Sequence, residues 1–136
     1  MGIILDASVI IAGERGLLDF VSWIASRPDD QFSLAAISIA ELWHGLERAD
    51  DLRRPRRAAY LASVVKTLPI IPYTETIAYR HAAIWAALVR SGKMIDPHDL
   101  IVAATALGRG DAVATLNGRH FREIPALVVI EPAVTR

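Results

Sequence analysis

The chain has 136 residues, of which 53% are hydrophobic, and its 15 basic side chains balance its 15 acidic ones. This length predicts a single domain, residues 1–136, and the apolar share excludes a disordered chain. The chain has no cysteine, which excludes disulfides and thiolate metal sites, and its zero net charge gives no support to a basic nucleic-acid binder. The N-terminal residues meet Asp6 without a basic segment before it, and no uncharged run is long enough to span a bilayer, so we expect a cytoplasmic protein with no membrane association.

Short apolar runs alternate with longer helical patterns along the chain. The apolar runs predict five buried strands, at residues 3–5, 32–37, 70–71, 112–115 and 127–130. The helical patterns cover residues 9–12, 17–25, 38–49, 55–66, 75–89, 97–107 and 119–121. This alternation predicts an α/β protein with a parallel sheet and helices on both of its faces.

The clearest helix start lies at residues 96–107. Asp96 is suited to the N-cap, and Pro97 to the first helical position, where its missing N–H costs nothing. Asp99 then falls in the first turn, where the helix dipole favours a negative charge. The following residues are small and apolar up to Gly108 and Gly110, so we expect this helix to be buried on most sides.

Three acids are expected at equivalent positions, each in the opening turn of an apolar helix. They are Asp6, Glu41 and Asp99. Asp6 follows the first strand, and Glu41 completes the capping-box pattern S-x-x-E that begins at Ser38. Taken singly, each acid has an ordinary role as a helix cap or a dipole partner. In an open parallel sheet, however, these positions meet at the carboxyl edge, where ligands bind.

A cluster of these three carboxylates requires a proton or a cation. Two carboxylates about 5 Å apart repel by roughly 3 kcal/mol at an effective dielectric constant near 20. Hard carboxylate oxygens without cysteine select Mg²⁺, with Mn²⁺ as a substitute. The sequence pattern alone leaves open whether the three side chains converge.

Four motifs resemble the PIN domains, in particular the VapC-type toxins of type II toxin–antitoxin systems. They are I-I-L-D-A-S-V-I-I at the N-terminus, I-S-I-A-E-L around Glu41, P-H-D-L-I-V-A-A-T-A-L around Asp99, and A-T-L-N-G-R-H-F-R-E-I from Ala114. They occur in the family's order and cover nearly the entire chain. The resemblance implies a PIN-like three-layer α/β/α sandwich with a five-stranded parallel sheet. It also implies a Mg²⁺-dependent ribonuclease that is a homodimer and is inhibited by a cognate VapB-type antitoxin.

The resemblance assigns roles to individual residues. It makes Asp6, Glu41 and Asp99 the catalytic, metal-binding acids, with the hydroxyls of Ser8 and Thr115 behind them. Asn117 stands where many relatives carry a fourth acid, which leaves open whether one or two metal ions are held. Asp96 is near enough in sequence to replace that acid, but we expect it to be the N-cap.

Other functions and other residues remain alternatives at this stage. A haloacid-dehalogenase-like enzyme would carry a second aspartate at the position of Ser8, and a receiver-like module would need a lysine after its last strand, whereas the only lysines are Lys66 and Lys93. A non-catalytic metal-binding or interaction module stays open because of Asn117. Two interpretations of the arginine run stay open: contact with RNA phosphates, or a solvated helix start beside Asp50 and Asp51. We give the second at least equal weight. The arginines are Arg53, Arg54, Arg56 and Arg57.

The histidines and aromatic residues give weaker signals. His44, His81 and His98 have no metal-ligand spacing and are interpreted as structural or exposed, whereas Arg119 and His120 lie near the expected site through the resemblance. The large aromatic side chains are interpreted as core, although some of them could line a dimer face or an antitoxin groove: Trp23, Trp43, Tyr60, Tyr79 and Trp85.

Overall fold

Five parallel strands form the centre of the structure, a computed structural model that describes residues 1–134. The strands are β1 (Gly2–Leu5), β2 (Gln31–Ala35), β3 (Ile70–Ile71), β4 (Ala112–Ala114) and β5 (Val129–Ile130). They lie in the order β3-β2-β1-β4-β5, and every pairing is parallel. The predicted five-stranded parallel sheet is therefore confirmed.

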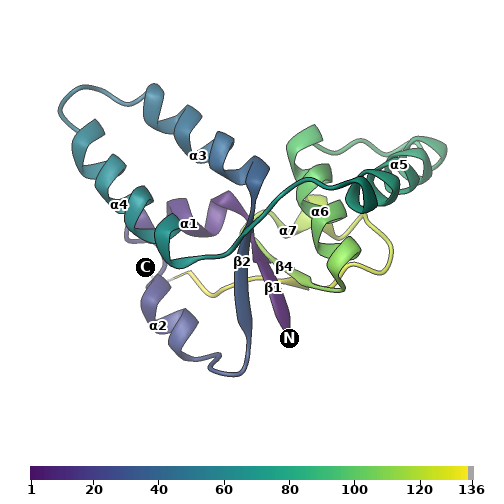
Figure 1. The fold of residues 1–136 in the computed structure, drawn as a ribbon, viewed down its shortest axis with the longest axis horizontal. Helices are drawn as coiled ribbons and strands as arrows, with labels where there is room; N and C mark the ends of the chain where they lie inside the picture. The colour runs from purple at the N-terminus through teal and green to yellow at the C-terminus, as the bar shows by residue number, and fades with distance from the viewer. Residues whose placement is uncertain (135–136) are drawn as a thin grey trace.

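Helices cover both faces of this sheet. They are α1 (Ala7–Glu14), α2 (Phe20–Ala25), α3 (Ala36–Glu47), α4 (Arg54–Thr67), α5 (Glu75–Arg90), α6 (Pro97–Arg109) and α7 (Gly118–Phe121). Figure 1 shows α1, α2 and α4 on one side of the strands and α5 and α6 on the other, with α3 rising from the end of β2. The arrangement is the predicted three-layer α/β/α sandwich.

The central strand β1 shows why its sequence is apolar at every position. Ile3 and Leu5 pack into the core on the side of α1 and α4, whereas Ile4 packs into the core on the side of α5 and α6. All three side chains are fully buried. A strand whose alternating side chains enter two different cores has no polar face, which is typical of parallel sheets covered on both sides.

The strand order places a topological switch beside β1. From β1 the chain builds β2 and β3 on one side, and it then crosses to build β4 and β5 on the other. Leu5, the last residue of β1, pairs with Leu34 of β2 and with Ala114 of β4. The residues that follow these strand ends therefore meet at one carboxyl edge, next to the switch where such sheets bind ligands.

Helix α6 forms as its sequence predicts. The Asp96 carboxylate accepts hydrogen bonds from the backbone N–H groups of His98 (2.8 Å) and Asp99 (3.4 Å), so it is the N-cap. Gly110 ends the helix in the left-handed region (φ 72°), which glycine adopts without strain. Gly108, also expected at the end, lies inside the helix.

The predicted capping box at the start of α3 is wrong. The helix begins at Ala36, its N-cap is Ala35, and no side chain caps it. Strand β2 leads straight into the helix, so the end of the strand sets the helix start two residues before Ser38. The Ser38 hydroxyl is consequently buried without a hydrogen-bond partner, and Glu41 lies in the second turn of α3 rather than in the first.

The arginine run at the start of α4 is engaged mainly with nearby acids. Arg53 pairs with Asp50 (3.7 Å), and Arg54 pairs with Asp51 (3.2 Å), all at the solvated helix start that was the alternative to RNA contact. Arg54 also donates to the carbonyl of Ala49, which follows α3. This part of the surface gives RNA contact no specific support.

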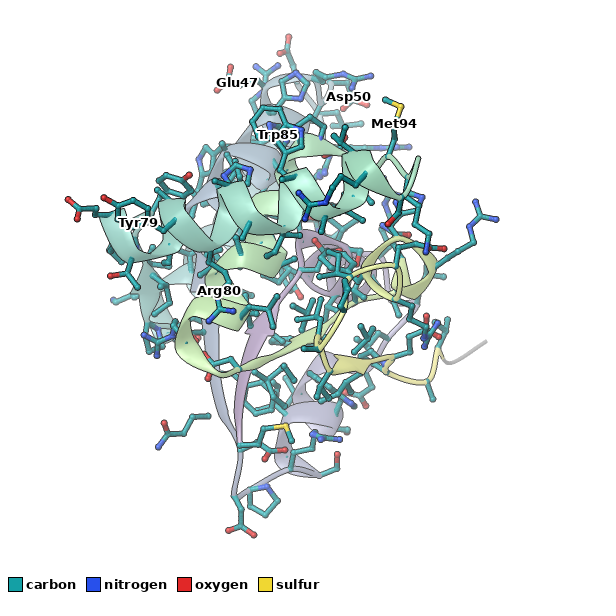
Figure 2. All side chains as sticks on the ribbon, turned by 90° about the vertical axis from the view of Figure 1, so that its right-hand side faces the viewer. Glu47, Asp50, Tyr79, Arg80, Trp85 and Met94 are labelled. Atoms are coloured by element: carbon teal, nitrogen blue, oxygen red, sulfur yellow. The ribbon has the colours of Figure 1, made fainter. Side chains whose placement is uncertain are left out.

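The aromatic side chains divide between the core and the surface. Trp23, Trp43 and Tyr60 pack partly buried against the core on the α1 side, as predicted. Tyr79 and Trp85 are 71% and 59% exposed, so a core role is wrong for both, because they stand on the outer side of α5 (Figure 2). In residues 1–134, the helices are too short or too polar to cross a bilayer.

Candidate active site

Asp6 is buried at the carboxyl edge of β1, although it is a charged residue. It is the N-cap residue of α1, but its side chain does not cap the helix. Instead, its Oδ2 atom accepts hydrogen bonds from the hydroxyls of Ser8 (2.7 Å) and Thr115 (2.8 Å), and the side chain is only 2% exposed. Two donors on one oxygen fix the carboxylate while leaving Oδ1 available to a ligand.

Ser8 and Thr115 also join two distant parts of the chain. Their hydroxyl oxygens lie 3.3 Å apart. Thr115 Oγ1 accepts from the backbone N–H of Asn117 (2.9 Å), and Ser8 Oγ accepts from that of Leu116 (3.1 Å). The turn after β4 is therefore held against the turn after β1, with Asp6 between them, and both hydroxyls donate to its carboxylate.

Glu41 projects from α3 toward the same place. Its side chain is 24% exposed, and its Oε1 atom is buried without a hydrogen-bond partner. Burial, and after it the charges of Asp6, Asp99 and Asp96, together raise the pKa of Glu41 to about 7. A buried carboxylate oxygen without a donor is costly unless a proton or a cation compensates it.

Asp99 completes the acidic cluster from the first turn of α6. Burial and the charge of Asp6 raise its pKa, whereas His120 lowers it. The charges of these acids act on one another, so the fold brings together the three side chains that the sequence singled out: Asp6, Glu41 and Asp99. They come from segments that are separate in sequence, and each reaches the edge beside the β1–β4 switch.

Two histidines flank the carboxylates. His98 Nδ1 lies 3.8 Å from Glu41 Oε1, and His120 Nδ1 lies 3.4 Å from Asp99 Oδ2. Both imidazoles are about half exposed, so they stand at the mouth of the cluster. His98 is exposed, which agrees with the expectation from the sequence, but its contact with Glu41 depends on the packing of α3 against α6 and has no local sequence signal.

The positions of Asn117 and of the two lysines bear on the alternative functions, a non-catalytic module and a receiver-like module. Asn117 is exposed at the N-cap of α7, where its side chain makes no capping bond, so it remains free to meet a ligand. Lys93 pairs with Glu123 (2.7 Å), and Lys66 lies in the last turn of α4. Neither lysine is near the carboxylates in the described contacts, so the receiver-like alternative gains no support.

The chemistry of the cluster fits a hard divalent cation. Three carboxylates face one another, and one of their buried oxygens lacks a donor. Such oxygens are the ligands that Mg²⁺ and Mn²⁺ prefer. Within residues 1–134, no three acidic or histidine side chains are already arranged as a set of metal ligands.

Comparisons with known proteins agree with this architecture. The model of the PIN domain matches residues 3–127. Ribonuclease VapC of Rickettsia bellii is 34% identical over 131 residues, which are 96% of each chain. A VapBC2 structure from Rickettsia felis, bound to a DNA fragment from their promoter, superposes with a TM-score of 0.90 at 18% identity, over 98% of this chain and 100% of that one. VapBC-5 of Mycobacterium tuberculosis, a member of the VapBC family of toxin–antitoxin systems, gives a TM-score of 0.74 at 27% identity over 98% of both chains.

Proposed function

The chain belongs to the PIN-domain family, among the VapC ribonucleases, and we propose that it is a metal-dependent ribonuclease acting as the toxin of a toxin–antitoxin pair. The observation that carries the proposal is the convergence of Asp6, Glu41 and Asp99 at the carboxyl edge, where the charge of Asp6 helps to raise the pKa of both Glu41 and Asp99. RNA in the cytoplasm is the proposed substrate, and hydrolysis of its phosphodiester bonds is the reaction.

The three acids would hold Mg²⁺, or Mn²⁺ in its place. When bound, this cation supplies the positive charge that activates water and stabilises charge on the phosphate. The hydroxyls of Ser8 and Thr115 keep the Asp6 carboxylate in one orientation. Glu41, whose Oε1 has no donor, is placed to orient the attacking water as well. Asn117 offers an amide oxygen, a weaker ligand than a carboxylate, so we expect one firmly held ion.

The protein partners follow from the family and from one apolar surface. The structural relatives include toxin–antitoxin systems, and they support a cognate antitoxin of the VapB type as the inhibitor. We assign the homodimer contact to the groove between α5 and α6, a pocket of about 640 Å³. Its lining is mainly apolar and includes Trp85, Val89 and Met94.

A second copy fits this groove because a two-fold contact places the same surface opposite itself. A face that carried one sign of charge would repel its copy. Here Lys93 is the only charged side chain of the lining, and it is already paired with Glu123. Met94 is 95% exposed and Val89 65% exposed, which leaves substantial apolar area for a partner to cover.

The test of the function is RNA cleavage by the purified protein without its antitoxin. We expect cleavage in Mg²⁺ or Mn²⁺, none in EDTA, and a loss of at least about a thousandfold in Asp99→Asn, because removal of a central metal-holding charge disables the site. Asp29→Asn is the matched control, since Asp29 is exposed before β2, at the opposite edge of the sheet. Metal-independent cleavage, or full activity in Asp99→Asn, would refute the proposal.

A further inference from the structure

Ser38 is a buried polar residue that the proposed mechanism does not use. It stands at the third position of α3 and is fully buried, and its hydroxyl has no hydrogen-bond partner. A buried donor without an acceptor is costly, and native structures contain few of them. The hydroxyl therefore calls for an explanation other than the stability of this state of the protein.

The position of Ser38 in α3 explains why it lacks the usual local acceptor. A serine or threonine inside a helix can donate to the carbonyl four residues earlier, as Thr105 of α6 does to Ile101 (2.8 Å). For Ser38 that residue is Leu34, which belongs to β2. Because β2 runs directly into α3 (Figure 1), the Leu34 carbonyl is part of the strand and not of a helical turn.

Glu41 carries an unpaired acceptor on the same helix, three residues after this unpaired donor. Its Oε1 atom is buried without a donor, and His98 Nδ1, at 3.8 Å, lies beyond hydrogen-bond distance. Residues three apart on a helix are neighbours, with Cβ atoms about 5–6 Å apart. Helical side chains also lean toward the N-terminus of their helix, so that of Glu41 leans over the turn that contains Ser38.

The other two acids of the cluster show how differently Glu41 is held. The Asp6 carboxylate accepts from two hydroxyls, and that of Asp99 lies 3.4 Å from His120 Nδ1. Within residues 1–134, Glu41 is the one of the three acids whose carboxylate accepts no hydrogen bond. It is therefore the acid that is free to turn, and the Ser38 hydroxyl is a donor within the span of one helical turn.

We propose that Ser38 is a positioning residue, whose hydroxyl donates to one Glu41 carboxylate oxygen and so directs the other oxygen to the divalent cation. This inference rests on the proposed metal-dependent function and adds one residue to the site. Donors behind a metal ligand fix its orientation in this way and raise the affinity for the metal. Only side-chain rotation is needed, because the two residues are already neighbours on α3.

The test compares Ser38→Ala with the natural chain in two measurements that should respond in different ways. In urea unfolding with EDTA, the variant should be at least as stable as the natural chain, because the hydroxyl that it loses has no partner. In isothermal titration calorimetry, its affinity for Mn²⁺ should be about tenfold lower, because Glu41 loses the donor that orients it. A purely structural role for Ser38 would change the stability and leave the Mn²⁺ affinity as it is.

Thr105→Val is the matched control. Thr105 is also a buried hydroxyl residue inside a helix, but it has its own acceptor in Ile101, and valine keeps its shape. This variant should bind Mn²⁺ like the natural chain. The inference is overturned if Ser38→Ala binds Mn²⁺ as tightly as the natural chain, or if it is less stable than the natural chain in EDTA. If the natural chain itself binds no Mn²⁺, the metal-dependent function fails, and the role of Ser38 fails with it.

Discussion

Ionisation of the Glu41 carboxyl costs more free energy in the folded chain than in the unfolded chain. Burial is the main cause, and the charges of Asp6, Asp99 and Asp96 add to it. Burial, and then the charges of Asp6 and Asp96, also raise the pKa of Asp99, whereas His120 lowers it. The site is therefore a local cost to stability that a proton or a divalent cation relieves, as is common where function sets the choice of residues.

This cost predicts a pH dependence of stability in the metal-free protein. The pKa of Glu41 rises from its ordinary 4.5 to about 7 on folding, so between these values the folded chain binds more protons than the unfolded chain. The free energy of unfolding should therefore fall as pH rises from 4.5 to 7, by at most about 3 kcal/mol for this group. Urea unfolding in EDTA across this range measures it.

Glu41→Gln is the control for this prediction. The amide cannot ionise, so the variant should show a smaller fall and should be more stable than the natural chain at pH 7 without metal. Added Mg²⁺ should restore stability to the natural chain at pH 7 and have little effect on the variant. Identical pH profiles for the two proteins would contradict the assignment of the raised pKa to Glu41.

At the scale of the elements, helices that start after a turn were better predicted than a helix that continues a strand. Asp96 and Pro97 mark the start of α6 through their own chemistry, and the helix begins there. Ser38 and Glu41 carry an equally good capping pattern, but β2 runs directly into α3 and shifts the helix start to Ala36. Local patterns cannot report such a junction, because the sheet decides where the strand ends.

The cap of α6 gives a prediction that separates two roles of one residue. Asp96→Ala should lower the free energy of unfolding by about 1 kcal/mol, because the N–H groups of His98 and Asp99 lose their acceptor. Asp96→Asn keeps an acceptor, since asparagine is an equally good N-cap, and should retain both stability and RNA cleavage. Urea unfolding and the cleavage assay check both variants. A loss of cleavage in the stable Asn variant would instead make Asp96 a metal ligand.

The architecture of the whole molecule was predictable in class but not in every contact. Apolar runs and helical periodicity predicted the parallel sheet with covered faces, and the family resemblance supplied the three-layer form. The approach of His98 to Glu41 was missed, since it arises from packing between α3 and α6. Trp85 and Tyr79 were also misplaced in the core, because an apolar side chain on a helix looks the same in sequence whether its own chain or a partner covers it.

A single substitution that adds a negative charge to the α5–α6 groove tests whether the protein self-associates through it. Trp85→Glu places a carboxylate on the face that a second copy would cover, and each dimer would then bury two of them. We expect the natural chain to elute as a dimer and the variant as a monomer in size-exclusion chromatography with light scattering. Tyr79→Glu, an exposed position on α5 outside the groove lining, is the control and should remain dimeric. A dimeric Trp85→Glu protein would exclude this face as the contact.

The hydroxyl contacts between Ser8, Thr115 and Asp6 join residues more than a hundred positions apart, and this has a consequence during synthesis. A ribosome releases the N-terminal part first, so Asp6 and Glu41 emerge long before β4 and Thr115 exist. Until residues 112–117 are outside the ribosome, β1 lacks its neighbour β4 and the Asp6 carboxylate lacks one of its two donors. Under the proposed function, the site of a nascent chain is therefore incomplete until β4 and Thr115 have emerged, and the proposed antitoxin has that interval in which to arrive.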